Sequence, residues 1–295
     1  MPDYRDTNIE ELRHLVSDRA MTGETLLLNM GPQHPSTHGV LRLLLELDGE
    51  IVQNCIPDIG FLHTGVEKNM ESKTYQKAEV MTDRLDYLNP IGNNLVFCLA
   101  VEKLVDLDVP ERAQAIRVIL TELTRLSSHL LWLGTSALDL AAMSLFMYTM
   151  REREMILDIC EMCSGQRMMT TYIRPGGLWR DVPAEFGSAV RNFVSIFPKR
   201  MDEYESMLTR NPLFKDRTVG IGRISQEDCI RYGITGPVLR ASGKAFDLRK
   251  IHPYSGYDRY DFDIPTQSTE DVYARYLVRV QEMRESIKII DQALN

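Results

Sequence analysis

Two short stretches of this sequence carry the side chains best suited to proton transfer. The first, GPQHPSTHG, holds the imidazoles of His34 and His38. The second, RLDYLNP, places the guanidinium of Arg84, the carboxylate of Asp86 and the phenol of Tyr87 within four residues. Histidine exchanges protons near neutral pH, and tyrosine, with an ordinary pKa of about 10, still holds its proton there. The stretches could form an acid–base site, although a core tyrosine and a histidine that caps a turn remain open as structural alternatives.

The first stretch must be a loop that a sheet positions. Pro32 and Pro35 lack amide donors and bias the residues before them away from the helical region. A strand is predicted directly after it over residues 40–47, followed by an Asp48-Gly49 turn and a returning strand over residues 50–56. Alternation in the first strand places Arg42 and Glu46 on one face. Four leucines lie on the other face: Leu41, Leu43, Leu45 and Leu47. We expect a small antiparallel sheet with both histidines at its edge.

The rest of the sequence is predicted to be mostly helical. The expected helices cover residues 66–78, 93–105, 110–163 with a break near Gly134, 183–197 and 199–208, then a short helix opened by Ser225 with Asp228 and a last one opened by Ser268 with Asp271. We therefore expect an α+β, mostly helical chain. Its parts are an N-terminal arm over residues 1–24 with a short helix, a β subdomain over 25–62 and a helical domain over 63–295.

Composition limits the possible functions. The net charge of −8 argues against nucleic acid as a partner, because phosphate backbones bind basic surfaces. Five cysteines without framework spacing are typical of reduced thiols in the cytoplasm, and the polar N-terminus does not read as a signal peptide. The apolar segment over residues 130–149 could span a bilayer in length, but Asp139 near its middle favours a helix buried in a large domain.

The sequence does not predict a metal or nucleotide site. The spacing of His34 and His38 would suit a metal on a helix, which the two prolines exclude. Cys160 and Cys163 form a lone pair in an apolar helix, more typical of buried thiols than of a zinc or iron–sulfur site. A glycine pattern beginning at Gly220 lacks the third glycine of the dinucleotide fingerprint.

A series of ordered blocks resembles a known family. The blocks are GPQHPSTHG, FLHTGVEK, KTYQKA, RLDYLNP, YIRPGG, RASGKAFDLRK and YSGYDRYDFDIP, and they cover nearly everything after about Glu24. They are similar to the D-type subunit of the proton-pumping NADH-quinone oxidoreductase, respiratory complex I. That family is similar in fold to the large subunit of nickel-iron hydrogenases, so the resemblance implies a hydrogenase-like helical core with a small antiparallel β subdomain on its N-terminal side.

The resemblance also implies that a metal cage has been lost. Hydrogenase large subunits carry an Arg-x-Cys-Gly-x-Cys-Pro-x-x-His stretch whose thiolates bind nickel. The matching positions here hold Asp86, Asn89 and Asn93 in place of the two cysteines and the histidine. A carboxylate and an amide do not replace soft thiolates at that geometry, which excludes an active hydrogenase. In the family, the vacated space resembles a pocket for a quinone headgroup.

The family's site residues carry over to matching positions. The resemblance implies that Tyr87 and His38 donate protons to the reduced quinone and that Asp139 is the partner of His38. Further residues are implied to line the pocket or lie near the iron–sulfur cluster: His34, Thr37, Gly39, Thr64, Arg84, Asp86 and Met169. Thr64 and Met169 depart from the family pattern, which often has arginine and histidine there.

The resemblance implies partners as well. This chain is expected to bind no cofactor alone, to take quinone as substrate, and to receive electrons from an iron–sulfur cluster held by the neighbouring B-type subunit. The C-type subunit and the H-type membrane subunit are further expected partners, on the cytoplasmic face of the cell inner membrane or the matrix side of a mitochondrion. An inactive structural or assembly role is the alternative. Because the helical pattern still runs at Asn295, we expect either a fragment or a C-terminal segment on another chain.

Overall fold

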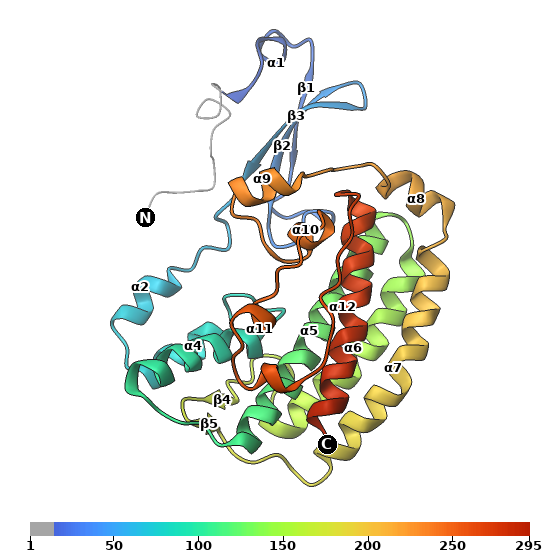
Figure 1. Cartoon of the computed structure of the whole chain (residues 1–295). Coiled ribbons are helices and arrows are strands. Elements are labelled where there is room, and N and C mark those ends of the chain that lie inside the picture. The colour runs from blue at the N-terminus through green and yellow to red at the C-terminus, as the bar shows by residue number, and fades with distance from the viewer. Residues whose placement is uncertain (1–14) are drawn as a thin grey trace. The chain divides into compact units, whose positions relative to one another are not determined.

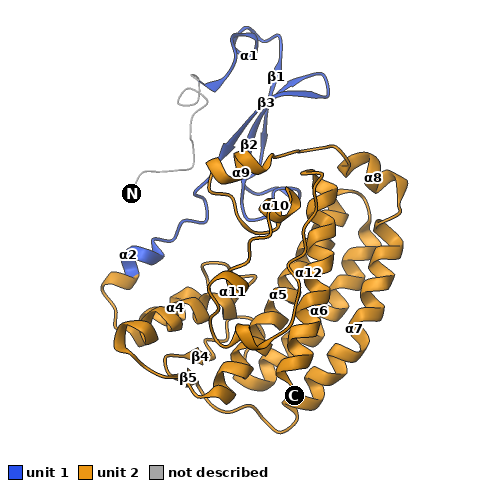
Figure 2. Ribbon diagram, in the orientation of Figure 1, with its two compact units in different colours: residues 1–69 blue, residues 70–295 orange. Residues whose placement is uncertain are grey.

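The structure is a computed structural model, and it describes residues 15–295 (Figure 1). The chain divides into two compact units, Met1–Asn69 and Met70–Asn295 (Figure 2). The part of the expected N-terminal arm before residue 15 lies outside the described residues. From residue 15 onward the arm holds one short helix, α1, Asp18–Thr22, whose N-cap is Ser17.

The first unit contains the predicted antiparallel sheet. Its strands are β1 (Leu26–Met30), β2 (Arg42–Asp48) and β3 (Ile51–Asp58), in the order β1-β2-β3. The register pairs Met30 with Leu43 and Leu44 with Ile56. The histidine loop therefore joins two paired strands, and the sheet fixes both of its ends. Helix α2, Val66–Glu71, begins in this unit and ends two residues beyond its boundary at Asn69.

The buried face of β2 is the one that carries Glu46. Leu44 and Glu46 are 1% and 4% exposed, whereas the leucines predicted for the opposite face are only half-buried. The Glu46 carboxylate tolerates burial because Thr25 Oγ1 donates to it at 2.9 Å and the Ser17 hydroxyl donates to it as well. The alternation is thus confirmed, but leucine content alone does not identify the face that packs inward.

The second unit is built mainly from helices. They are α3 (Tyr75–Thr82), α4 (Pro90–Val105), α5 (Glu111–Asp139), α6 (Met143–Ser164), α7 (Phe186–Leu208), α8 (Pro212–Thr218), α9 (Gln226–Arg231), α10 (Gly236–Ala241), α11 (Leu248–Ile251) and α12 (Val272–Ala293). A two-stranded ribbon, β4 (Ile173–Arg174) with β5 (Gly177–Leu178), and a 3-10 turn, η3 (Tyr257–Arg259), lie between them. The mostly helical α+β class with a small N-terminal antiparallel sheet is confirmed.

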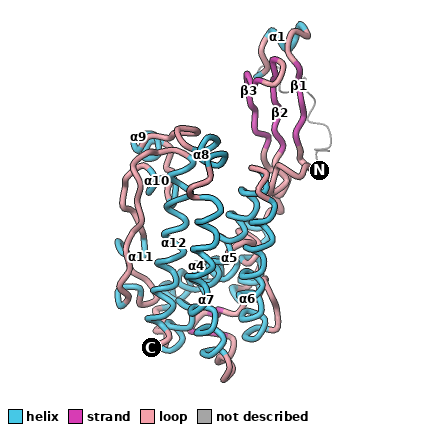
Figure 3. Tube along the Cα trace, turned by 90° about the vertical axis from the view of Figure 1, so that its right-hand side faces the viewer, coloured by secondary structure: helices cyan, strands magenta, loops and turns pink. Residues whose placement is uncertain are grey.

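Four long helices form the core of the second unit. Helix α5 packs on α6 and α12, and α7 packs on the same two helices, which closes a bundle (Figures 1 and 3). The core side chains are apolar and almost completely buried, among them Leu123, Leu126, Leu130, Ile156, Phe193, Phe197 and Met283. Helix α4 packs on α3 and α5, so the RLDYLNP stretch, which joins α3 to α4, lies at the side of this bundle.

Several predicted helix boundaries were wrong. The break in the long segment lies at residues 140–142, where Ala141 has a φ of 67°, and not at Gly134. A Cβ atom on Gly134 would lie 2.5 Å from Thr149 Oγ1, so this glycine lets α6 approach α5 closely. Helix α7 continues through Pro198 instead of dividing there, with Phe197 and Met201 fully buried on either side. The helix predicted over residues 66–78 is two helices, α2 and α3.

The helix caps follow the sequence more closely. Ser225 caps α9 as predicted, because its Oγ accepts from the backbone N–H of Asp228 at 3.1 Å. Helix α12 begins one turn later than a Ser268 cap requires, with Asp271 Oδ1 accepting from Ala274 N at 2.7 Å.

The apolar segment over residues 130–149 is divided between α5 and α6. Within residues 15–295 no helix combines the length and hydrophobicity needed to cross a bilayer.

Candidate functional site

The loop between α3 and α4 holds Tyr87 in a fixed backbone conformation. Asp86 Oδ1 accepts from Leu88 N at 3.1 Å, and Asn93 Nδ2 donates to the Asp86 carbonyl at 2.9 Å. Arg84 Nη1 donates to the Val80 carbonyl at 2.7 Å and so ties the loop to α3. Tyr87 itself is 41% exposed. The loop is stiff, and its phenol is accessible to a partner or substrate.

The base of this loop is polar and buried. Thr171 Oγ1 donates to Asp83 Oδ2 at 2.5 Å, and Asn94 Nδ2 donates to Thr82 Oγ1 at 2.8 Å. Burial raises the pKa of Asp83, although the hydrogen bond from Thr171 lowers it. Asp83 comes directly before Arg84, so this contact fixes where the loop leaves α3 and connects it to the segment before β4.

Glu79 is a buried carboxyl group in the same base. Its side chain is fully buried and lies 3.4 Å from Arg174 Nη1, while its Oε1 has no hydrogen-bond partner within residues 15–295. Burial raises its pKa to about 7, against the opposing effect of Arg174. Between pH 4.5 and about 7 the folded state therefore holds more protons than the unfolded state, and stability falls as pH rises through that window.

Replacing Glu79 with Gln is expected to remove this pH dependence. A neutral amide has no proton to lose, so E79Q should gain stability relative to the parent as pH rises from 4.5 to about 7. Urea unfolding at several pH values measures the effect. Glu111→Gln, at a side chain that is 80% exposed, is the matched control. Parallel pH profiles for the parent and E79Q would contradict the assignment.

A very small cavity lies behind Tyr87. Its volume is about 10 Å³, which is room for about one water molecule. It is lined from the loop, α4, α5, α6 and the segment after α6, by Tyr87, Leu88, Pro90, Ile91, Thr124, Ser127, Arg153, Ile156, Leu157, Cys160, Arg167 and Met168. A ring-sized substrate does not fit this cavity, so it would meet Tyr87 from its exposed side.

Two cations line this cavity that the sequence had not singled out. Arg153 is half-buried, and its Nε has no hydrogen-bond partner within the part of the chain that the structure describes. Its Nη2 lies 3.8 Å from Met168 Sδ, and burial lowers its pKa. Arg167 forms ion pairs with Glu154 and Asp158. Only the alternating Arg151-Glu152-Arg153-Glu154 run gave a signal in the sequence, and such a run usually marks a solvated helix face.

The histidine loop is ordered by its own polar contacts. Thr37 is buried, and both its backbone N and its Oγ1 donate to the His34 carbonyl, at 3.1 and 3.2 Å. Ser36 N donates to His34 Nδ1 at 3.1 Å. Gly31 opens the loop with a φ of 92°, and a Cβ there would lie 2.1 Å from the Leu41 carbonyl oxygen. His34 and His38 are exposed, and Gly39 follows with a φ of 77°.

Asp139 does not lie inside a buried helix. It is the last residue of α5 and is exposed, so the prediction of a carboxylate in the middle of a continuous apolar helix was wrong. The physical reason is the turn at residues 140–142, where Ala142 N donates to the Ala137 carbonyl at 2.8 Å and ends the helix. A carboxylate at a helix C-terminus meets the negative end of the helix dipole, which favours a nearby cation or hydrogen-bond donor.

The predicted site residues are divided between the two units. His34, Thr37, His38, Gly39 and Thr64 belong to the first unit, and Arg84, Asp86, Tyr87, Asp139 and Met169 belong to the second. Within the second unit Met169 is half-buried next to Met168, which lines the cavity behind Tyr87. The meeting of Tyr87, His38 and Asp139 stays a prediction. Among residues 15–295 no group of three or more His, Cys, Asp and Glu side chains is placed to hold a metal.

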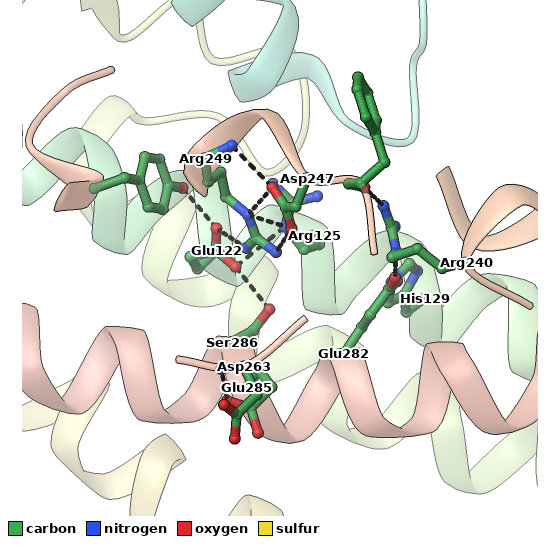
Figure 4. Close-up of polar contacts among 12 residues, drawn as sticks. Glu122, Arg125, His129, Arg240, Asp247, Arg249, Asp263, Glu282, Glu285 and Ser286 are labelled. Carbon is green, nitrogen blue, oxygen red and sulfur yellow. Dashed lines mark hydrogen bonds and ion pairs between the residues drawn. The ribbon is translucent and has the colours of Figure 1, made fainter. Parts of the chain in front are cut away.

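A buried charged network holds α5, α12 and the segment around α11 together (Figure 4). Both oxygens of the fully buried Glu122 are engaged. Arg249 Nη1 and the Tyr257 hydroxyl donate to Oε1 at 2.9 and 2.6 Å, while Ser286 Oγ and Arg125 Nε donate to Oε2 at 2.6 and 3.1 Å. Arg249 also pairs with Asp247 at 2.7 Å. The sequence did not predict this network, because Arg249 and Ser286 are 127 and 164 residues away from Glu122 in the chain.

Next to this network, His129 lies 3.0 Å from Glu282, which also pairs with Arg240 (Figure 4). Burial lowers the pKa of His129, against the raising effect of Glu282. This contact connects α5 to α12.

Comparisons with known proteins identify relatives over most of this chain. Residues 139–295 match the family described as respiratory-chain NADH dehydrogenase, 49 Kd subunit. The second D-type subunit of NADH-quinone oxidoreductase from Chloroflexus aurantiacus is 62% identical over 270 residues, covering 92% of this chain and 66% of that protein. The second D-type subunit from Roseiflexus sp. is 64% identical, with 92% and 65% covered. The D-type subunit from Geotalea uraniireducens is 57% identical, with 92% and 70% covered.

This chain spans slightly less than two thirds of the length of the Chloroflexus and Roseiflexus relatives, 66% and 65%. The identity extends over almost the whole of this chain, and the described fold agrees with the expected helical class. The chain therefore belongs to the family of the respiratory-chain NADH dehydrogenase 49 kDa subunit, which is the D-type subunit of NADH-quinone oxidoreductase.

Proposed function

We propose that this chain acts as the quinone-site subunit of a proton-translocating NADH-quinone oxidoreductase. The observation that carries the proposal is Tyr87, an accessible phenol on a loop that is hydrogen-bonded at Asp86 and fixed to the bundle at Asp83. The relatives' names supply the reaction class, and the loop supplies a proton donor with a defined position. The chain works only within the assembled enzyme, because its electrons come from a neighbouring subunit.

The proposed chemistry is the protonation of a reduced quinone. A quinone that receives two electrons takes up two protons and becomes a quinol with two hydroxyl groups. Tyr87 supplies one proton and His38, as an imidazolium, supplies the other, because a phenol and an imidazolium can both act as general acids. The two electrons arrive one at a time from an iron–sulfur cluster held by the neighbouring B-type subunit. Reprotonation of both donors from water closes the cycle.

Asp139 is proposed to hold His38 in its protonated form. When His38 donates its proton, the Asp139 carboxylate loses its cationic partner, and this change in charge drives the rearrangement that couples quinone reduction to proton translocation. The exposed position of Asp139 at the end of α5 supports this role, because a partner can approach a helix end more readily than a helix interior. The B-type and C-type subunits and the H-type membrane subunit are the proposed partners, at the cytoplasmic face of the inner membrane or the matrix side.

Replacing Asp139 with Asn is expected to slow quinone turnover roughly tenfold, as expected for the loss of about 1.4 kcal/mol of charge stabilisation. Reduction of the iron–sulfur clusters by NADH should be unchanged. Stopped-flow cluster reduction and steady-state quinone reduction in the assembled enzyme measure the two steps separately. Asp202→Asn, at an exposed carboxylate on α7, is the control. Turnover equal to the parent's would remove Asp139 from the mechanism.

Met169 is proposed to weaken the pH dependence of the neighbouring cluster's potential, because a thioether takes up no proton when the cluster is reduced. A histidine at this position would couple protonation to reduction. In the assembled enzyme, Met169→His is expected to give a potential that falls with pH by up to about 59 mV per unit. Redox titrations at several pH values measure the slope, with Met147→His, at an exposed methionine of α6, as the control. Identical slopes for the parent and M169H would contradict this role.

The small size of the cavity behind Tyr87 favours one alternative, an inactive structural or assembly role. The two functions differ in whether quinone reaches Tyr87. A quinone analogue bound to the assembled enzyme should protect Tyr87 from nitration if it lies at the headgroup, while the exposed Tyr75 should react equally with and without the analogue. Equal nitration of Tyr87 in both conditions would favour the structural role.

A further inference from the structure

A second cavity lies between α5, α8 and α12. Its volume is about 190 Å³. For comparison, an engineered protein cavity of about 150 Å³ holds benzene, so this space accommodates a molecule about the size of one ring. Trp132, Leu133, Ala137 and Leu140 line it from α5, and Phe214 lines it from α8. None of the residues proposed to contact quinone lines this cavity.

Two guanidinium groups line the same cavity from one turn of α12. Arg275 donates to the carbonyls of Glu270 and Gly222, at 3.0 and 2.9 Å. Arg279 Nη1 donates to the Arg275 carbonyl at 3.3 Å, and its guanidinium carbon lies 4.5 Å from the centre of the Trp132 ring. These contacts orient both side chains but do not neutralise them. Within residues 15–295 neither arginine forms an ion pair with a carboxylate.

The carboxylates nearest in the chain are already engaged. Glu282 Oε1 pairs with Arg240 at 2.5 Å, and its Oε2 lies 3.0 Å from His129. Asp271 Oδ1 accepts from Ala274 N, and its Oδ2 accepts from Gly220 N at 2.8 Å. Both carboxylates hold helices in place with all of their oxygens. Neither can turn to Arg275 and Arg279 without leaving those contacts unmade.

The electrostatics agree with this geometry. Burial lowers the pKa of Arg279 to about 10. The nearby cations Arg275 and Arg240 also lower this pKa, whereas the Glu282 carboxylate raises it. Burial also lowers the pKa of Arg275, although the Asp271 carboxylate raises it. Removing cations from water without a counter-ion is unfavourable, so an anion between these guanidiniums would relieve the cost.

We propose that this cavity binds a small organic anion. Its carboxylate, or a group of similar shape, accepts hydrogen bonds from Arg275 and Arg279, since planar guanidinium groups match such acceptors. Its apolar body, of about one ring, packs against Trp132, Ala137 and Phe214. The volume excludes a nucleotide, which is several times larger than one ring.

Trp132 makes the proposal testable by fluorescence. The chain has two tryptophans, Trp132 and the exposed Trp179, so Trp179→Phe leaves Trp132 as the only tryptophan. The full chain in this background is titrated at constant ionic strength with benzoate and with benzamide, its uncharged analogue. A saturable change with benzoate is expected, with at least about tenfold weaker binding of benzamide, because a charged acceptor makes the stronger hydrogen bonds to arginine.

Three substitutions in the same background identify the site. Arg279→Gln should weaken benzoate binding at least about tenfold, because it removes a charged donor. Arg284→Gln, on the same helix but paired with Asp202 and Glu205, is the matched control and should bind as the parent does. Ser136→Met keeps both arginines and places a larger side chain in the cavity, so it should also weaken binding.

Ser136→Met keeps the test decisive if Arg279→Gln does not fold. Circular dichroism of each variant checks its fold. Equal affinities for benzoate and benzamide, no saturable change with benzoate, or unchanged benzoate binding in both Arg279→Gln and Ser136→Met would overturn the proposal.

Discussion

Quinone reduction by the assembled enzyme is expected to fall about a hundredfold or more when Tyr87 is replaced with Phe. The substitution removes one hydroxyl group and keeps the ring, so the loop between α3 and α4 should keep its conformation. General acids typically contribute a factor of about 10² to 10⁴ to a proton-transfer step, and Tyr87 is proposed to be one of only two donors. Binding of quinone should change less than turnover, because a phenol that donates its proton acts mainly in the transition state.

The measurement separates chemistry from assembly. NADH oxidation with an artificial acceptor that draws electrons before the quinone site should proceed at the parent rate in Y87F. Tyr75→Phe is the matched control, since Tyr75 is an exposed phenol on α3 and lies in the same unit. A solvent isotope effect on quinone reduction that differs between Y87F and the parent would support a proton donor. Full quinone turnover in Y87F would reject the proposed mechanism.

The sequence predicted local structure best where one short signal decides it. Ser225 with Asp228 gave the correct cap of α9, because a hydroxyl three residues before an available N–H forms that contact locally. The Asp48-Gly49 signal likewise predicted the hairpin of β2 and β3, although the two turn residues are Gly49 and Glu50, one position later. These features depend on neighbours in the chain, so tertiary structure has little opportunity to change them.

Features that depend on distant residues were predicted less well. The inward face of β2 is set by Ser17 and Thr25, which hold Glu46, and neither residue is near it in sequence. Continuity of α7 through Pro198 depends on burial of Phe197 and Met201, which outweighs the lost hydrogen bond of the proline. The break after Asp139 also lacked a proline or glycine, the residues that usually signal one.

The candidate site was predicted in part. The residues of the two loops were identified by motif, and the structure shows that each loop is held by hydrogen bonds within its own unit. Arg153 on α6 and Arg167 in the segment after α6 were missed, because charged residues in a helix or just beyond its end usually face solvent. The network around Glu122 was missed because its members are distant in the chain. Arg249 and Ser286 are 127 and 164 residues away from Glu122.

This network should make one of the largest contributions to stability. Replacing Arg249 with Met is expected to cost about 3–5 kcal/mol of the free energy of unfolding, the usual result of leaving a buried charge without its partner. Glu122 would keep Arg125 but lose its contact with Arg249, and Asp247 would lose its pairing arginine. Urea unfolding of the full chain, followed by circular dichroism, measures the change. Arg112→Met, in an exposed pair with Asp181, should cost less than about 1 kcal/mol.

A double-mutant cycle distinguishes a broken pair from lost packing. If the cost of Arg249→Met comes from stranding the Glu122 carboxylate, the combined Glu122→Gln and Arg249→Met variant should be clearly more stable than the sum of the single changes predicts. Additive costs would instead assign the loss to packing of the arginine on the Phe262 ring, 4.8 Å away.

The pH profile of unfolding gives an independent measurement of the role of Glu122. The pKa of Glu122 is lowered to about 2, since Arg125, Arg249 and the donated hydrogen bonds outweigh its burial. Its contribution is therefore present above pH 4.5 and is lost as pH falls toward 2, so Glu122→Gln should reduce the acid dependence of unfolding in that window.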